Sequence, residues 1–180
     1  MFSLFDTIRD GLINIAPGMP PNCWGITACI LIILMTAALV DIFTGLVPDI
    51  LIVIGLLTVT GAQGAFASWD IAAHHLAQAI AAGALIWVVN YIWYRLFKRD
   101  ALGMGDAKWT MLAVDCFGVL PALFAWGLGA ILAVAFIATM HLARRKIARV
   151  TFVPFLFVGL CFGLHWISIY HLGTLFSDRI

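Results

Sequence analysis

Two aspartates stand in this apolar chain at places where packing gives no reason for a carboxylate. Asp41 directly follows the hydrophobic run 23–40, and Asp106 ends the tetrapeptide Gly103-Met104-Gly105-Asp106. A charged side chain at the edge of hydrocarbon costs about 3 kcal/mol, so an acid there is a candidate functional group. If the two side chains meet, they form a carboxylate pair that is suited to acid–base catalysis.

The composition decides which class of protein must position these acids. The 180 residues are 64% hydrophobic and 11% charged, whereas soluble domains carry about 25% charged residues. We therefore expect a polytopic membrane protein in contact with the lipid bilayer. The net charge of +1 argues against a nucleic-acid partner. The four cysteines include no C-x-x-C pair, so the sequence predicts neither a metal site nor a cofactor.

The apolar runs predict an all-α fold with about six transmembrane helices. A membrane span needs roughly 20 apolar residues. The region 107–142 is too long for one span, and Gly118 and Pro121 divide it because proline interrupts helical hydrogen bonding. The six expected spans are 23–40, 50–67, 71–94, 107–117, 122–142 and 153–176. Residues 1–22 predict a short amphipathic helix at the membrane interface, followed by a single transmembrane domain over 23–180.

Basic residues orient the spans. Eight of the ten Lys and Arg residues lie in the segments 95–108 and 144–149, and the positive-inside rule places both segments in the cytoplasm. Counting spans backwards puts the 41–49 loop in the cytoplasm as well. Asp41 and Asp106 are therefore expected on the same membrane face.

The tetrapeptide ending at Asp106 has two readings. Gly103 and Gly105 let main chain approach closely and adopt unusual dihedral angles, so a substrate strand could lie beside the acid. The alternative is an ordinary turn between helices in which the aspartate caps the next helix.

The 41–49 segment favours a catalytic role for its first acid. Pro48 suits the first turn of the following helix, and Asp49 complements the positive end of that helix, which is a structural role. Asp41 instead ends a span, where the negative end of the helix dipole opposes its charge. Because its placement runs against its electrostatic preference, Asp41 is the better catalytic candidate.

The combination of Asp41…Pro48-Asp49 with the segment Gly103-Met104-Gly105-Asp106-Ala107-Lys108 resembles the type IV prepilin peptidases and the archaeal preflagellin peptidases, which are membrane aspartyl proteases of the Gly-x-Gly-Asp type. The segment 151–156, Thr-Phe-Val-Pro-Phe-Leu, is similar to a Pro-Phe segment that opens a late span in that family. The resemblance covers about residues 23–163. It implies that Asp41 and Asp106 are the catalytic pair. The residues expected to bind substrate or shape the site are Pro48, Asp49, Gly103, Gly105 and Lys108.

The same resemblance implies a substrate and a mechanism. The chain lacks the N-terminal C-x-x-C region of the full-length members, so it resembles the short members found with tight-adherence (Flp) pili, and methyltransferase activity is not expected. The implied activity is cleavage of a short basic leader from prepilin precursors at the cytoplasmic face of a bacterial or archaeal membrane. One carboxylate acts as general base on water, while its protonated partner polarises the scissile carbonyl. This mechanism requires no metal.

Two other functions remain open from the sequence. Asp41, Asp106 and Asp115 could form a carboxylate relay in a small proton- or solute-coupled transporter. A non-catalytic assembly subunit is a third reading. Lys108 could attract substrate carboxylates or tune Asp106, or it could simply anchor the cytoplasmic boundary. Asp115, within the fourth expected span, has no counterpart that the resemblance explains.

Overall fold

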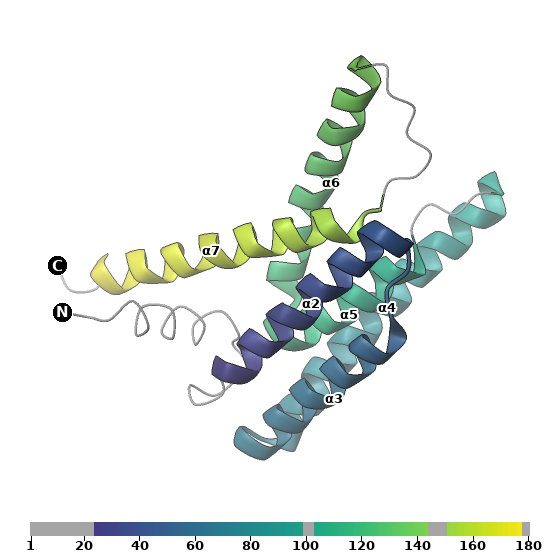
Figure 1. Cartoon of the computed structure of the whole chain (residues 1–180). Coiled ribbons are helices and arrows are strands. Elements are labelled where there is room, and N and C mark those ends of the chain that lie inside the picture. The colour runs from purple at the N-terminus through teal and green to yellow at the C-terminus, as the bar shows by residue number, and fades with distance from the viewer. Residues whose placement is uncertain (1–23, 99–102, 144–150, 178–180) are drawn as a thin grey trace.

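The computed structural model describes residues 24–98, 103–143 and 151–177, which form six helices (Figure 1). No strand occurs among these described residues. The helices are α2 (Trp24–Thr44), α3 (Asp49–Phe66), α4 (Trp69–Phe97), α5 (Met104–Phe117), α6 (Val119–Leu142) and α7 (Val153–Ser177). The expected all-α fold is confirmed, whereas the interfacial helix expected in 1–22 lies outside the described residues.

Four of the six helices are long and apolar enough to cross a membrane, which agrees with a polytopic membrane protein. They are α2 from Gly25 onwards, α3, α4 and α6. The two other expected spans do not meet this standard in the described part of the chain. In α7 the part whose side chains the structure describes, Val153–Trp166, is apolar and shorter than a span, while the helix itself runs to Ser177. Helix α5 has 14 residues and is about 21 Å long, which is shorter than the hydrocarbon core of about 30 Å.

Glycines with positive φ set two of the helix ends. Gly45 (φ 66°) closes α2, and its N–H donates to the Asp41 carbonyl oxygen at 2.8 Å. The sequence prediction ended this helix too early, at residue 40, so Asp41 lies within the last turn of α2 and not after it. Gly118 (φ 85°) ends α5 and confirms the predicted division. Helix α6 then begins at Val119 and carries Pro121 in its first turn, where the missing N–H needs no partner.

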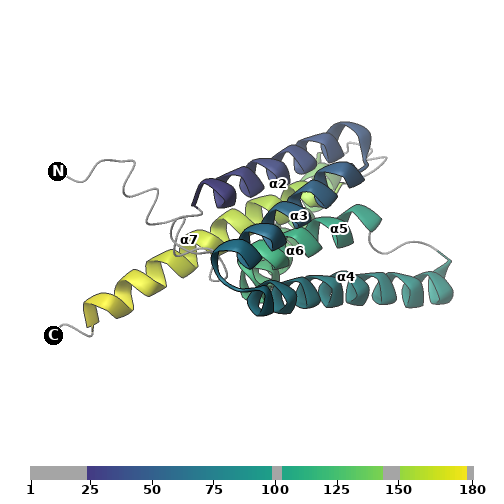
Figure 2. The ribbon, with the colours of Figure 1, turned by 90° about the horizontal axis from the view of Figure 1, so that it is seen from below.

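Short helix α5 is the centre of the packing. Ten of its 14 residues are buried, and it contacts α2, α3, α4, α6 and α7. The side chains of Trp109, Leu112 and Phe117 are fully enclosed. Figure 2 shows α5 between α2 and α3 on one side and α4 on another. A helix of this length, with acids near both ends, can hold a polar group at each end of the bundle core.

Helices α6 and α7 form a separate close crossing (Figure 1). A Cβ added to Gly159 would lie 2.6 Å from the Ala125 carbonyl oxygen, and one added to Gly129 would lie 3.0 Å from the Phe155 carbonyl oxygen. Small residues at such a crossing let helix backbones approach closely, which is a common way for membrane helices to associate. The crossing places the beginning of α7 beside the middle of α6.

Candidate functional site

The structure brings Asp41 and Asp106 to the same end of the helix bundle. Asp41 lies in the last turn of α2 and Asp106 in the first turn of α5. The two helices are tied together by Trp109, whose Nε1 donates to the Leu34 carbonyl oxygen at 3.3 Å. Asp41 is 6% exposed and Asp106 is 5% exposed. Two acids that are 65 residues apart in the sequence are therefore buried together.

The electrostatics of Asp106 show that the two carboxylates interact. Burial is the largest cause that raises the pKa of Asp106, the Gly103 N–H that bonds its carboxylate lowers this pKa, and the charge of Asp41 raises it, so that the net pKa is about 6. Asp106 lies in the first turn of α5, outside the four helices that are long and apolar enough to cross a membrane. When one of two close carboxylates is ionised, ionisation of the other becomes harder. The arrangement therefore favours the protonated form of one of the two acids.

Asp106 also caps its own helix. The Gly103 N–H donates to Asp106 Oδ2 at 2.9 Å, so the carboxylate reaches back from the third helical position to the N-cap residue. The capping alternative drawn from the sequence is thus correct, although Gly103 and not Asp106 is the N-cap. This bond uses one carboxylate oxygen. It fixes the orientation of the side chain, which a catalytic acid also requires.

The two glycines before Asp106 act differently from each other. Gly103 has ordinary extended dihedrals (φ −73°, ψ 146°), and Gly105 is not among the positive-φ glycines, so the expectation of unusual dihedral angles is wrong for both. A Cβ on Gly105 would lie only 2.8 Å from Val47 Cγ2. Gly105 therefore allows the first turn of α5 to approach the segment after α2 closely. This approach sets the position of Asp106 relative to Asp41.

Asp49 and Lys108 join the beginnings of α3 and α5. Lys108 Nζ lies 2.5 Å from Asp49 Oδ1, and the Asp49 side chain is 72% exposed. Asp49 occupies the first turn of α3, as expected, while Pro48 precedes the helix as its N-cap and does not enter the first turn. The sequence analysis considered both charged residues but missed their pairing. Their opposite charges beside two helix starts were the available signal.

An open cavity of about 490 Å³ borders the turn that carries Asp41. One side of it is formed by residues 42–45, which directly follow Asp41, and the opposite side by Phe136 and the 151–155 segment. The 151–156 segment noted in the sequence thus lies near the end of α2. Thr44 and Thr151 are the lining residues with polar side chains.

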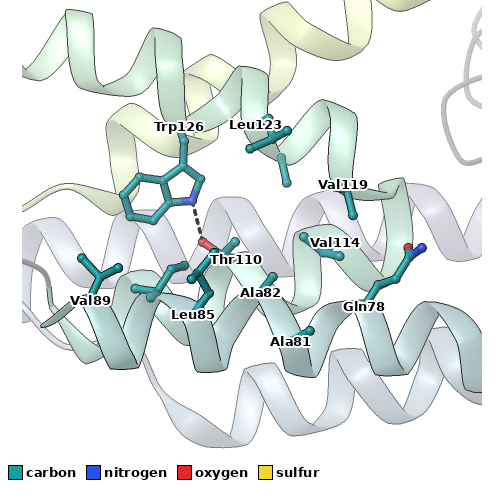
Figure 3. Close-up of a pocket in the computed structure, with 12 residues that line it drawn as sticks. Gln78, Ala81, Ala82, Leu85, Val89, Thr110, Val114, Val119, Leu123 and Trp126 are labelled. Carbon is teal, nitrogen blue, oxygen red and sulfur yellow. Dashed lines mark hydrogen bonds between the residues drawn. The ribbon is translucent and has the colours of Figure 1, made fainter. Parts of the chain in front are cut away.

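A second cavity of about 510 Å³ lies between α4, α5 and α6 and is mainly apolar (Figure 3). Thr110 connects it to the acid pair, because the Thr110 hydroxyl donates to the Asp106 carbonyl oxygen at 2.6 Å. The same hydroxyl accepts from Trp126 Nε1 at 3.0 Å, as the dashed line in Figure 3 shows. Sequence reasoning missed Thr110. A hydroxyl residue four positions after Asp106 was the signal, since such a side chain can bond the carbonyl one helical turn earlier.

Asp115 is not part of the acid pair. It follows Asp106 by nine residues, which is about 13.5 Å along the helix and half a turn around it. Its carboxylate faces α3, where the Thr60 hydroxyl donates to Asp115 Oδ2 at 3.2 Å. Within the described residues, no group of three or more His, Cys, Asp or Glu side chains could hold a metal ion.

Comparisons with protein-family models, with curated proteins and with solved structures give no match for this chain.

Proposed function

We propose that the protein is a membrane aspartic endopeptidase that removes the short basic leader from type IV (Flp-like) prepilin precursors at the cytoplasmic boundary of a bacterial or archaeal membrane. The observation that carries the proposal is the buried, electrostatically coupled pair Asp41 and Asp106. Two acids in such a pair differ in protonation, and this difference supplies a base and an acid in one site. The resemblance of the two motifs to prepilin peptidases supplies the substrate class.

The chemistry is hydrolysis by a pair that shares one proton. The ionised carboxylate removes a proton from water, whose oxygen attacks the scissile carbonyl carbon, while the protonated carboxyl hydrogen-bonds to the carbonyl oxygen and then protonates it. Collapse of this intermediate breaks the C–N bond. The departing nitrogen takes a proton from the carboxyl that gained one from water, and one hydroxyl of the intermediate returns its proton to the other carboxylate. The products are a carboxylic acid and an amine, and the pair again holds one proton, as at the start. The apparent pKa values belong to the pair as a unit.

Two hydrogen bonds position Asp106. The Gly103 N–H holds the Asp106 carboxylate, and the Thr110 hydroxyl holds the Asp106 carbonyl. The cavity beside residues 42–45 gives an extended peptide room next to the turn of Asp41. We place the cleaved bond of the precursor at this end of the bundle, with the leader toward the cytoplasm and the apolar helix of the precursor toward the membrane.

The transporter hypothesis receives less support from the geometry. A relay needs its carboxylates within reach of one another, yet Asp115 is about 13.5 Å along α5 from Asp106 and points to the opposite side. Its contacts are with Thr60 and Gln63 of α3. The peptidase proposal needs only the two acids that are buried together.

The proposal is tested with purified protein in detergent and candidate prepilin precursors, with mass spectrometry of the products. Wild type should release a single leader peptide, and the Asp41→Asn and Asp106→Asn proteins should release none. Asp70→Asn is the matched control, because Asp70 is an exposed acid in the first turn of α4. Size-exclusion chromatography and circular dichroism show whether each variant is folded. Cleavage by folded Asp106→Asn protein at the wild-type rate would contradict the proposal.

A further inference from the structure

A second polar cluster lies in the core at the other end of α5. It consists of Thr60 and Gln63 on α3 and Asp115 on α5, and both Gln63 and Asp115 are completely buried. The Thr60 hydroxyl donates to Asp115 Oδ2 at 3.2 Å, and Gln63 Nε2 donates to the Asp115 carbonyl oxygen at 2.9 Å. The proposed peptidase chemistry does not use any of these groups.

Two acceptor atoms of this cluster have no hydrogen-bond partner in the described structure. They are Asp115 Oδ1 and Gln63 Oε1, and both are buried. A buried polar atom without a partner destabilises the fold, because it has lost its hydrogen bonds to water without replacement. Because Gln63 Nε2 is bonded to the Asp115 carbonyl, Oε1 of the same amide is held next to Asp115 as well. Both unpartnered atoms are acceptors, so whatever satisfies them must be a donor or a cation.

Asp115 lies near the carboxyl ends of two helices and has no basic partner. Helices α3 and α5 run side by side in the same direction, because Asp49 meets Lys108 at their beginnings and Gln63 meets Asp115 near their ends. The negative ends of these two helix dipoles therefore lie near the buried Asp115 carboxylate, at the end of the bundle where α4 and α6 begin. None of the described Lys, Arg or His side chains forms an ion pair with Asp115. A bridging water could satisfy the acceptors, but it would leave the charge uncompensated.

We propose that Thr60, Gln63 and Asp115 bind one monovalent alkali cation between α3 and α5. The site offers only oxygen atoms, from a carboxylate, an amide and a hydroxyl, and hard cations prefer such ligands. The Thr60 hydroxyl donates a hydrogen bond to Asp115 Oδ2, so the lone pairs of its oxygen are available to the cation. One positive charge neutralises one carboxylate, whereas a divalent ion would leave a net positive charge in apolar surroundings. The bound cation ties the carboxyl ends of α3 and α5 together, and this role does not depend on the proposed peptidase activity.

The test uses thermal unfolding of the full-length protein in detergent, followed by tryptophan fluorescence. Tm is measured at pH 8 in sodium chloride, potassium chloride and choline chloride at equal ionic strength. A bound cation predicts that Tm rises saturably by about 5 °C in at least one alkali salt relative to choline. The Asp115→Asn protein should lose this response, while the Asp70→Asn protein should keep it.

Two results would overturn the proposal. The first is an equal wild-type Tm in all three salts, which would mean that a proton and not an alkali cation neutralises Asp115. The second is an alkali response of Asp115→Asn that equals the wild-type response. The salt comparison on wild type needs no variant, so it remains decisive if Asp115→Asn does not fold.

Discussion

Replacement of Gly105 with alanine tests whether close packing at the start of α5 positions the acid pair. The added Cβ would lie 2.8 Å from Val47 Cγ2 and 3.3 Å from Val47 Cβ. Val47 is buried, and its branched side chain has few rotamers available, so it cannot move aside freely. The first turn of α5 must therefore shift away from the segment after α2, and Asp106 must shift with it.

The expected magnitude follows from two opposing terms. Overpacking of a close contact costs about 1–3 kcal/mol, while replacing a helical glycine with alanine stabilises the helix by up to about 1 kcal/mol. The middle of each range gives a net loss of about 1.5 kcal/mol. If the shift displaces Asp106 from Asp41 and raises the activation free energy by this amount, kcat/KM for precursor cleavage decreases about 5- to 30-fold.

The assay compares cleavage and unfolding of four proteins. They are wild type, Gly105→Ala, Val47→Ala and the double variant, in which the shortened Val47 side chain makes room for the new Cβ. The double variant should be more active and more stable than the two single losses predict, with a coupling above about 0.5 kcal/mol. Gly61→Ala is the control, because a Cβ on Gly61 meets nothing within 4 Å. Losses that add within about 0.3 kcal/mol would refute the reasoning.

Three further predictions concern pH, the ion pair and the break between α5 and α6. Folding raises the pKa of Asp106 from 3.8 to about 6, so the folded state binds the carboxyl proton of Asp106 more tightly than the unfolded state does. The stabilisation from this proton is complete below about pH 4 and is lost as the pH rises to 6. The Tm of wild type relative to Asp106→Asn should therefore fall between pH 4 and 6, and cleavage should decline above about pH 6 as the shared proton leaves. Lys108→Ala removes the exposed pair with Asp49 and should lower the unfolding free energy by less than about 1 kcal/mol, with cleavage within about threefold of wild type. Gly118→Ala places a side chain at φ 85° and ψ 175°, a backbone region occupied almost only by glycine, and should lower Tm by about 3–8 °C in thermal scans, whereas an unchanged Tm would show that the backbone there relaxes.

Much of the helical fold could be predicted because its signals are local. Long apolar runs predict α2, α3, α4 and α6, and Gly118 marks the break after α5. The helix ends were less accurate. The prediction stopped the first span before Asp41 because of its charge, although the apolar residues Ile42 and Phe43 continue the helix to Thr44. The prediction for α4 missed its last turn, which runs to Phe97, because Arg95 looked like a boundary.

The candidate site, like the fold, could be predicted from the sequence only in part. That Asp41 and Asp106 share one end of the bundle follows from counting helices, which needs only sequence. The contacts that fix the site depend on how each helix is rotated about its axis and on side-chain packing between helices. The approach of Gly105 to Val47 and the bond of Thr110 to Trp126 are of this kind. A chain of apolar helices without a strong amphipathic pattern leaves such rotations undetermined from sequence.

The claim that Asp41 and Asp106 act as one unit is tested most directly by the rates of precursor cleavage for Asp41→Asn, Asp106→Asn and the double variant. Groups that act as a unit lose nearly all of their contribution when either one is removed. The account therefore predicts that each single variant is as inactive as the double variant. A single variant that keeps substantial activity, or two single losses that multiply in the double variant, would contradict it.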